Sequence, residues 1–225
     1  CELYGKLRED KAYSRHPGSL YRVFVRLGYR KKVESTKKKS KHNGHYDTPT
    51  ELGIKWQMDV KYVPYVCYVG TDGEKFYQYT MLEEASRKRF IYAYKENSSH
   101  STVDFVQRAI IFFGYAPETI QTDHGGEFTH TQKTNRIHPF DILCNKLHIT
   151  HKVLRPRTPW HNGKVERSHR NDQERFYNHL SFYSYDDLQV QMKRYLYRSN
   201  NIPMSVLGWK TPNQKQYELE NMIYI

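Results

Sequence analysis

The sequence has 225 residues, 37% of them hydrophobic, which predicts one substantial folded core with small appendages rather than a disordered chain. Lysine and arginine total 36 against 24 acidic residues, and the formal net charge of +12 favours a polyanionic partner, with nucleic acid first. Because no run of about 18 apolar residues occurs, a membrane span is not expected. Three widely spaced cysteines argue against a disulfide framework and are typical of the reducing cytoplasm.

Residues 1–30 are expected to be helical. An apolar stripe at helical spacing is formed by Leu20, Val23, Phe24 and Leu27. Ser19 is the expected N-cap, and Gly28 is the expected helix stop. Arg22 and Arg26 lie together on a second face, so the segment suits a DNA-binding helix-turn-helix unit or its remnant. A small amphipathic helix with a solvated face is an equally open alternative.

Residues 31–50 form a basic linker, in which Lys37, Lys38 and Lys39 stand in one run. A run of like charges does not fold alone and is expected to follow DNA phosphates. A solvated tether is the other interpretation, and it is compatible with that role.

The main folded core is expected over residues 51–180, followed by a helical and irregular tail over 181–225. The expected elements, in chain order, are a strand at 54–63, two strands within 67–82 joined by a turn at 71–73, a strand at 88–95, a helix at 100–114, a strand at 118–123, a helix at 138–148, a strand at 148–154, a helix at 163–180, a helix at 188–200 and an irregular segment at 201–214. Adjacent strands followed by alternating helices and strands indicate an α/β fold, a mixed sheet with helices on its faces.

Three acids are the candidate catalytic and metal-binding residues: Asp59, Asp123 and Glu166. Asp59 lies inside an apolar strand, where a carboxylate needs a partner or a cation. Asp123 ends a strand before a glycine pair, and Glu166 stands in the first turn of a helix. If the three converge, they suit two Mg²⁺ or Mn²⁺ ions, because hard cations prefer oxygen ligands. Two such ions stabilise both the attacking and the leaving oxygen of a displacement at phosphorus.

Each acid also has a purely structural interpretation. Asp59 can be a satisfied buried acid, Asp123 a turn former and Glu166 a member of a surface ion pair. Glu127 is either a partner of the site or a turn residue. The functional interpretation therefore depends on the three acids together and on the residues around them.

The segments that contain the acids are WQMDVKYV, IQTDHGGEF and PWHNGKVERSHR. In this order they resemble the three motifs of insertion-sequence transposases with retroviral-integrase-like Asp-Asp-Glu (DDE) cores, and the resemblance covers about residues 51–215. It implies a ribonuclease-H-like fold, a two-metal site, DNA 3′-end cleavage and strand transfer, and a multimer acting on double-stranded element ends and target DNA. The interval from Asp123 to Glu166 is several residues longer than the family form, and we place the excess in an added loop at about 129–140.

The residues around the last motif are expected to contact DNA. Lys164, Arg167 and Arg170 are expected to hold phosphates beside the metal ions. Trp160 and His161 are candidates for contacts with the DNA end, although Trp160 can equally well pack on the core.

The sequence thus predicts a bacterial, nucleoid-associated transposase that needs no ATP of its own, since it lacks a Walker-type phosphate loop. Two alternatives stay open. One is a DNA-binding regulator with an unused core, and the other is a metal-dependent nuclease without joining activity.

Overall fold

The structure is a computed structural model that describes residues 2–31, 47–70, 73–154 and 162–222. Its centre is a five-stranded sheet with the strand order β3-β2-β1-β4-β5. The strands are β1 (Lys55–Tyr62), β2 (Tyr77–Glu83), β3 (Arg89–Tyr94), β4 (Thr119–Thr122) and β5 (Thr150–Val153). Strands β1, β2 and β3 pair antiparallel, whereas β4 pairs parallel to β1 and β5 pairs parallel to β4. The expected mixed sheet is confirmed.

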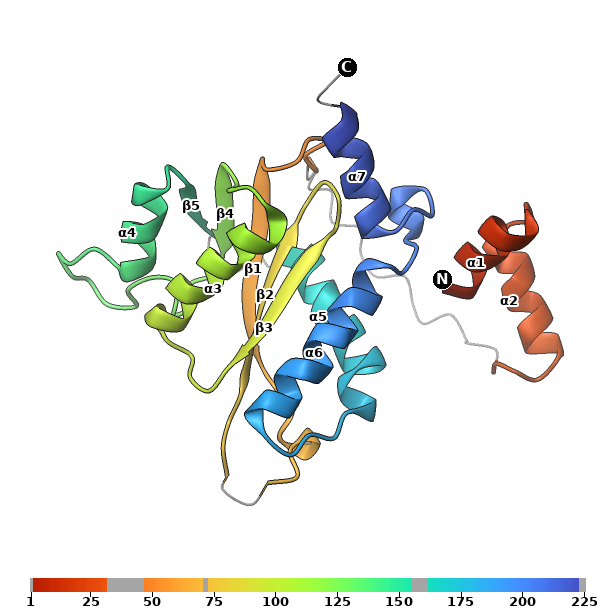
Figure 1. The fold of residues 1–225 in the computed structure, drawn as a ribbon, viewed down its shortest axis with the longest axis horizontal. Coiled ribbons are helices and arrows are strands. Elements are labelled where there is room, and N and C mark those ends of the chain that lie inside the picture. The colour runs from red at the N-terminus through yellow and green to blue at the C-terminus, as the bar shows by residue number, and fades with distance from the viewer. Residues whose placement is uncertain (1, 32–46, 71–72, 155–161, 223–225) are drawn as a thin grey trace.

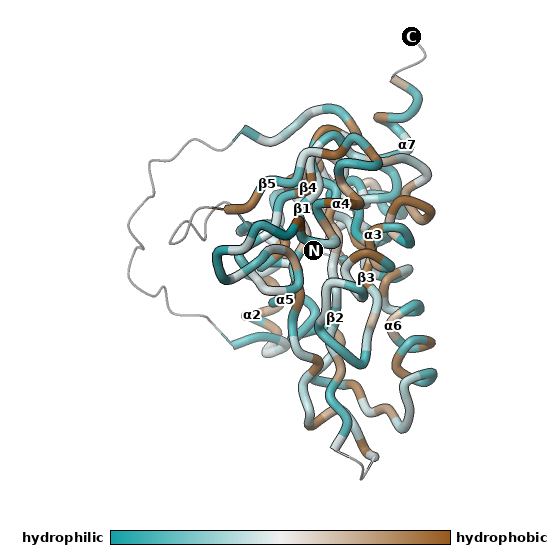
Figure 2. The backbone as a smooth tube through the Cα atoms, turned by 90° about the vertical axis from the view of Figure 1, so that its left-hand side faces the viewer, coloured by the Kyte–Doolittle hydropathy of each residue, from teal (hydrophilic) through white to brown (hydrophobic). Residues whose placement is uncertain are grey.

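Helices cover both faces of this sheet (Figure 1). The helices are α3 (Ser99–Phe113) and α4 (Pro139–Lys146) on one face, and α5 (Gly163–Arg175) and α6 (Tyr185–Asn200) on the other. Side chains of a strand alternate between faces, so Trp56 and Met58 of β1 enter the core under α3. Gln57 and Asp59 therefore point to the α5 side. The apolar stripe of α6, visible as alternating colours in Figure 2, packs against β3.

The outer edge of β3 is closed by polar side chains of α6. The Asn200 amide accepts from the backbone N–H of Arg89 at 3.1 Å and donates to the carbonyl of the same residue at 2.8 Å. At the other end of the strand, Tyr185 and Gln189 both donate to the carbonyl of Ala93. Backbone groups that face away from β2 thus find partners on a helix.

One predicted strand is wrong. The segment 67–70 was expected to be a strand, but a 3-10 helix spans Tyr65–Cys67 and only Tyr68 bridges to Phe182. The hairpin partner of β2 is β1 itself, continued by a bond from Val63 N–H to the carbonyl of Phe76. The turn expected at 71–73 includes residues 71 and 72, which lie outside the described residues.

The segment expected to be irregular, 201–214, ends inside helix α7 (Pro212–Met222), which begins with the last three residues of that segment. A capping box explains it: Thr211 Oγ1 accepts from Gln214 N–H at 3.1 Å, and the Gln214 side chain accepts from Thr211 N–H at 2.8 Å. Pro212, at the first helical position, supplies the right backbone angle. The predicted helix at 163–180 is also shorter than expected, because α5 ends at Arg175 and a 3-10 turn follows.

The N-terminal segment forms two helices, α1 (Glu2–Lys11) and α2 (Pro17–Arg26). The N-cap of α2 is His16, whose Nδ1 accepts from Gly18 N–H at 3.0 Å, so the predicted Ser19 cap is wrong. Gly28 has a φ of +75°, which suits the predicted stop. No residue of α2 is buried.

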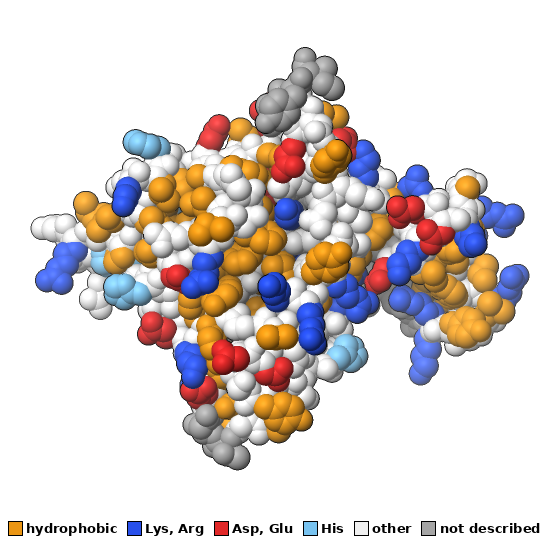
Figure 3. All heavy atoms as spheres, in the orientation of Figure 1, with side chains coloured by type: hydrophobic (Ala, Val, Ile, Leu, Met, Phe, Trp, Pro, Cys, Tyr) orange, Lys and Arg blue, Asp and Glu red, His pale blue; other side chains and the backbone are white. Residues whose placement is uncertain are grey.

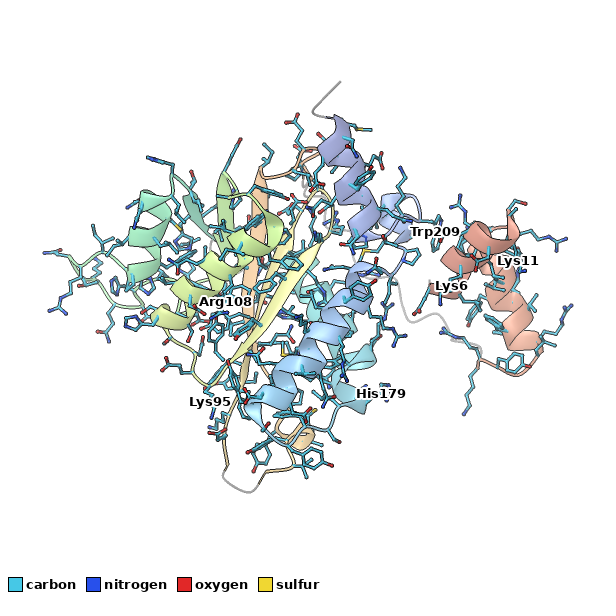
Figure 4. The ribbon with its side chains drawn as sticks, viewed as in Figure 1. Lys6, Lys11, Lys95, Arg108, His179 and Trp209 are labelled. Carbon is cyan, nitrogen blue, oxygen red and sulfur yellow. The ribbon has the colours of Figure 1, made fainter. Side chains whose placement is uncertain are left out.

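Helix α1 joins this pair to the end of the main body. The Tyr4 ring lies 4.3 Å from the Trp209 ring, centroid to centroid, and Trp209 stands beside α1 in Figure 4. Gly5 packs against Pro203, where an added β-carbon would lie 2.4 Å from the proline ring. Among the residues described, no helix is long and apolar enough to cross a membrane.

Candidate active site

Asp59 and Asp123 are brought side by side by the parallel pairing of β1 and β4. The register pairs Gln57 with Gln121, and continuing it by two residues sets Asp123 next to Asp59. Asp123 follows the last residue of β4, at the carboxyl end where parallel strands commonly carry functional groups. Its Oδ1 accepts from Gly125 N–H at 2.9 Å, so it is also the turn former that the sequence allowed.

Glu166 reaches the same edge from above the sheet. It stands in the first turn of α5, which packs on β1 and β2. His169, one turn further along α5, places Nδ1 3.4 Å from Asp59 Oδ2 and Nε2 3.0 Å from Thr80 Oγ1. Burial lowers the pKa of His169 to about 4, so the ring is neutral at pH 7. It therefore offers Asp59 no positive charge.

Three other carboxylates raise the pKa of Asp59, in addition to its burial. Burial raises its pKa to about 7, helped by the negative charges of Asp123, Glu166 and Glu127, and a bond from Val60 N–H opposes the rise. Glu127 folds back against Gly125, where a β-carbon would lie 2.6 Å from its carboxyl carbon. The glycine at 125 thus leaves room for a fourth acid, which supports the site interpretation of Glu127.

This donor set has the chemistry of a hard-cation site, because it consists of carboxylate oxygens that repel one another around Asp59. Over the described ranges, no group of three or more His, Cys, Asp and Glu side chains already stands in a metal-holding arrangement. Asp123 and Glu166 are both exposed, so their side chains have room to turn toward Asp59. The residues fit a magnesium-type ion by charge and ligand type.

A buried cluster that sequence reasoning missed anchors the start of α5. The side-chain oxygen of Gln57 accepts from Val165 N–H at 3.1 Å, and its amide donates to Glu84 at 2.8 Å. The second carboxylate oxygen of Glu84 takes the Lys164 ammonium. Gln57 and Glu84 have no exposed surface. The cluster ties the residue before Glu166 to the strand that carries Asp59.

A second polar chain runs from the site into the core between α5, β3 and α6. Thr80, which meets His169, accepts from Gln78, and Gln78 donates to Asp172 at 2.8 Å. Asp172 then pairs with Arg89 at 2.6 Å and accepts from Tyr195. The sequence signals for these polar residues are the period-2 spacing of Gln78 and Thr80 on β2 and the helical spacing of His169 and Asp172 on α5.

A third polar contact lies behind Asp123. His151 places Nε2 2.8 Å from Thr122 Oγ1 and Nδ1 2.6 Å from Asp141 Oδ1. Thr122 precedes Asp123 and is fully buried. The contact links β4 and β5 to α4, the helix that follows the loop where extra residues were expected.

The residues predicted to contact DNA lie in different places. Arg170 is exposed on α5, whereas Lys164 is turned to Glu84. Arg22 and Arg26 are exposed on α2. Figure 3 shows blue Lys and Arg side chains spread over the N-terminal pair of helices. The other candidates, Lys37, Lys38, Lys39, Trp160 and His161, lie outside the described residues.

Two family models described as integrase core domain match the chain, one over residues 49–159 and the other over residues 147–212. A putative integrase, ORF3 of Spiroplasma virus SpV1-C74, is 28% identical over 183 residues, or 77% of this chain and 49% of the relative. A retrovirus-related Pol polyprotein from transposon TNT 1-94 of Nicotiana tabacum is 30% identical over 100 residues, which are 44% of this chain and 7% of the polyprotein.

Solved structures show the same fold. The HTLV-2 integrase catalytic core domain in complex with magnesium has a TM-score of 0.55 at 20% identity, covering 74% of this chain and 97% of that one. The catalytic core domain of BIV integrase has a TM-score of 0.57 at 21% identity, covering 77% and 99%. A simian T-cell lymphotropic virus intasome in complex with PP2A regulatory subunit B56 gamma has a TM-score of 0.60 at 17% identity, covering 94% and 73%.

The fold is thus that of the integrase catalytic core, a ribonuclease-H-like polynucleotidyl transferase fold. The chain belongs to the integrase core domain proteins, with a core of the retroviral-integrase type. It spans about half the length of its Spiroplasma relative.

Proposed function

We propose that this protein is a DDE transposase that cuts DNA 3′ ends of a mobile element and joins them to target DNA. The observation that carries the proposal is the gathering of Asp123, Glu166 and Glu127 around the half-buried Asp59, whose pKa is raised to about 7 by its burial and by these negative charges. A regulator that only binds DNA does not need several carboxylates held close together, because placing like charges side by side is unfavourable.

In this proposal Asp59, Asp123 and Glu166 hold Mg²⁺ or Mn²⁺, two ions in the full site. The ions supply an activated oxygen nucleophile and stabilise the leaving oxygen. In the first step a water oxygen forms a bond to phosphorus and the 3′ oxygen leaves as a hydroxyl. In the second step that 3′ hydroxyl oxygen attacks a target phosphodiester, and a strand oxygen leaves, so one phosphodiester replaces another without ATP.

The protein's own groups prepare the site for this chemistry. The Gln57–Glu84–Lys164 cluster fixes the α5 turn that bears Glu166, and the neutral His169 contacts Asp59 without neutralising it. Arg170, exposed four residues after Glu166, is the proposed phosphate contact beside the metals. A multimer on paired DNA ends, at the bacterial nucleoid, completes the proposal.

The test uses labelled element-end duplex with Mg²⁺ or Mn²⁺. We expect Asp59→Asn, Asp123→Asn and Glu166→Gln each to abolish cutting and joining while leaving duplex binding within about twofold. Glu174→Gln, an exposed acid on the same helix, is the matched control and should cut normally. Cutting by any of the three site variants at the wild-type rate would sink the assignment.

Product analysis separates the proposal from its two alternatives. A transposase yields a recombinant strand that contains both element-end and target sequence. Cut ends without recombinants would identify a nuclease, and binding without cutting in either metal would identify a regulator with an unused core.

A further inference from the structure

A pocket lies on the side of α5 that is opposite Glu166. It has a volume of about 320 Å³ and is enclosed by α5, the β2–β3 turn and residues 202–206 after α6. On α5 its wall is formed by Lys164, Ser168, Asn171 and Arg175, with Arg167 at the rim. These positions recur every three or four residues and share one face of the helix. Glu166 is rotated about 200° from Lys164 around the axis, so the pocket is separate from the acids.

The pocket is strongly basic. Its cationic lining residues are Arg87, Arg89, Lys164, Arg167 and Arg175, and no Asp or Glu is among the described residues that line it. Arg89 and Lys164 are paired with Asp172 and Glu84 in the core. Arg167 and Arg175 are exposed and form no hydrogen bond or ion pair with any described residue. Two arginines therefore face the pocket ready for an anion.

The opposite wall is apolar. It contains Ile202, Pro203, Met204 and Val206, and Val206 is 71% exposed. A ligand that fits has a charged edge toward α5 and an uncharged body toward residues 202–206. The volume is at the lower end of the range for small-ligand sites, which excludes a whole duplex. A single strand can offer phosphates on one side and bases on the other, whereas a duplex keeps its bases stacked inside.

We propose that this pocket binds a short single-stranded stretch of DNA, with phosphates on Arg167 and Arg175 and bases against residues 202–206. The two arginines are eight positions apart, about 12 Å along the helix, so a strand lying along α5 meets both. The inference rests on the proposed function, because strand cutting near a DNA end leaves unpaired nucleotides on the opposite strand.

The test measures binding of a fluorescent oligothymidylate by anisotropy in EDTA, where no cutting occurs. The double variant Arg167→Ala with Arg175→Ala should weaken binding about tenfold and lower the slope of log K against log salt by about 1.4, at 0.7 per phosphate contact. Lys193→Ala with Arg194→Ala removes the same charge from exposed positions of α6 and is the matched control. Equal losses in the two doubles would overturn the proposal, as would an equal loss for a duplex of the same length.

The apolar wall has its own variant. Val206→Asp should weaken oligothymidylate binding, whereas Val206→Ser should not, and neither should alter folding because the side chain is exposed. If polyglutamate of equal charge competes as well as the oligonucleotide, the pocket recognises negative charge alone and the proposal fails. The Asp59→Asn variant keeps the two ideas apart: it should lose cutting and retain oligothymidylate binding. Pocket-dependent binding in a wild type that never cuts would overturn the transposase function alone.

Discussion

Asp59 occupies a place where its charged form is disfavoured by burial and by three neighbouring acids. A divalent cation held among these acids acts on Asp59 with the opposite sign and favours its ionised form. The same carboxylate that is costly without a metal is thereby a strong ligand with one. We therefore expect the residues that position Asp59 and Glu166 to affect cutting as well.

Substitution of Glu84 tests whether the buried cluster of Gln57, Glu84 and Lys164 positions Glu166 relative to Asp59. Glu84→Ala should lower the free energy of unfolding by about 3 kcal/mol, because it leaves Lys164 partly buried without its acid. Burial already lowers the pKa of Lys164 to about 8. We also expect slower cutting with little change in KM for DNA, since Glu84 has no exposed surface. Urea unfolding and steady-state kinetics measure the two effects.

A matched double variant distinguishes positioning from stability. Glu84→Leu with Lys164→Met should restore most of the unfolding free energy, because the ion pair is replaced by apolar groups. Cutting should stay slow, since Gln57 has lost the partner that orients it toward Val165 N–H. Full recovery of cutting in the double variant would show that the cluster only stabilises the fold.

The sequence indicates the acids far better than it indicates their supports. Asp123 and Glu166 stand in distinctive sequence motifs, whereas Asp59 rests on a looser strand pattern, and only the pairing of β1 with β4 sets it beside Asp123. Gln57 and Glu84 are far apart in the chain, and only the β1–β2 register brings them together. Polar residues that meet across a sheet leave no local pattern, so they could not be predicted.

Helix α5 is polar, and its contact with the sheet is correspondingly a polar layer rather than an apolar one. Asp172 of α5 lies at the centre of this polar layer, where it bonds to Gln78 of β2, Arg89 of β3 and Tyr195 of α6. Burial alone would raise the pKa of Asp172, but the Arg89 guanidinium more than offsets this and lowers it below the ordinary 3.8. Three elements are thus joined to α5 through one ionised side chain.

This arrangement predicts a dependence of stability on acid. Because the folded pKa is below the unfolded value, the contribution of Asp172 is complete above about pH 3.8 and is lost as the pH falls through the folded pKa. Asp172→Asn should therefore lower the unfolding free energy at pH 7 by about 3 kcal/mol and flatten its decline in acid. Urea unfolding between pH 2 and pH 7 checks this, with Glu174→Gln as the control. An unchanged acid slope would contradict the role of Asp172.

The hydrophobic periodicity of the sequence predicted the core strands and helices. It failed where side-chain hydrogen bonds, rather than periodicity, decide the local structure. The Thr211 and Gln214 capping box was readable in the sequence, yet the surrounding polar residues led to an irregular prediction. Segment 67–70 has strand-like residues, but Cys67 ends a 3-10 helix and its thiol bonds to the carbonyl of Tyr177.

Across the whole molecule, the N-terminal pair touches the body through α1 while α2 stays exposed. The contact is small and consists of Tyr4 on Trp209, Gly5 on Pro203 and an ion pair between Arg198 and Glu2. The apolar stripe of α2 was predicted correctly as a pattern, but no part of it is buried. That α2 binds DNA stays a prediction.

Gly5→Ala should release this contact. The new methyl group would overlap the Pro203 ring, so α1 must move away while the sheet and its cores are untouched. We expect faster proteolysis within residues 2–31, altered Trp209 fluorescence and an unchanged midpoint of unfolding for the main body. Lys6→Ala, an exposed change on the same helix, is the control. Unaltered protease protection in Gly5→Ala would mean that the contact does not hold α1.

The closed edge of β3 has a consequence for how the protein behaves when crowded. An open strand edge is a template on which a second sheet can grow, and many copies gathered along one DNA molecule would meet at such edges. Asn200 engages both backbone groups of Arg89, and Tyr185 and Gln189 engage the carbonyl of Ala93. On this side the molecule is thus protected against the pairing of its sheet with the sheet of another copy.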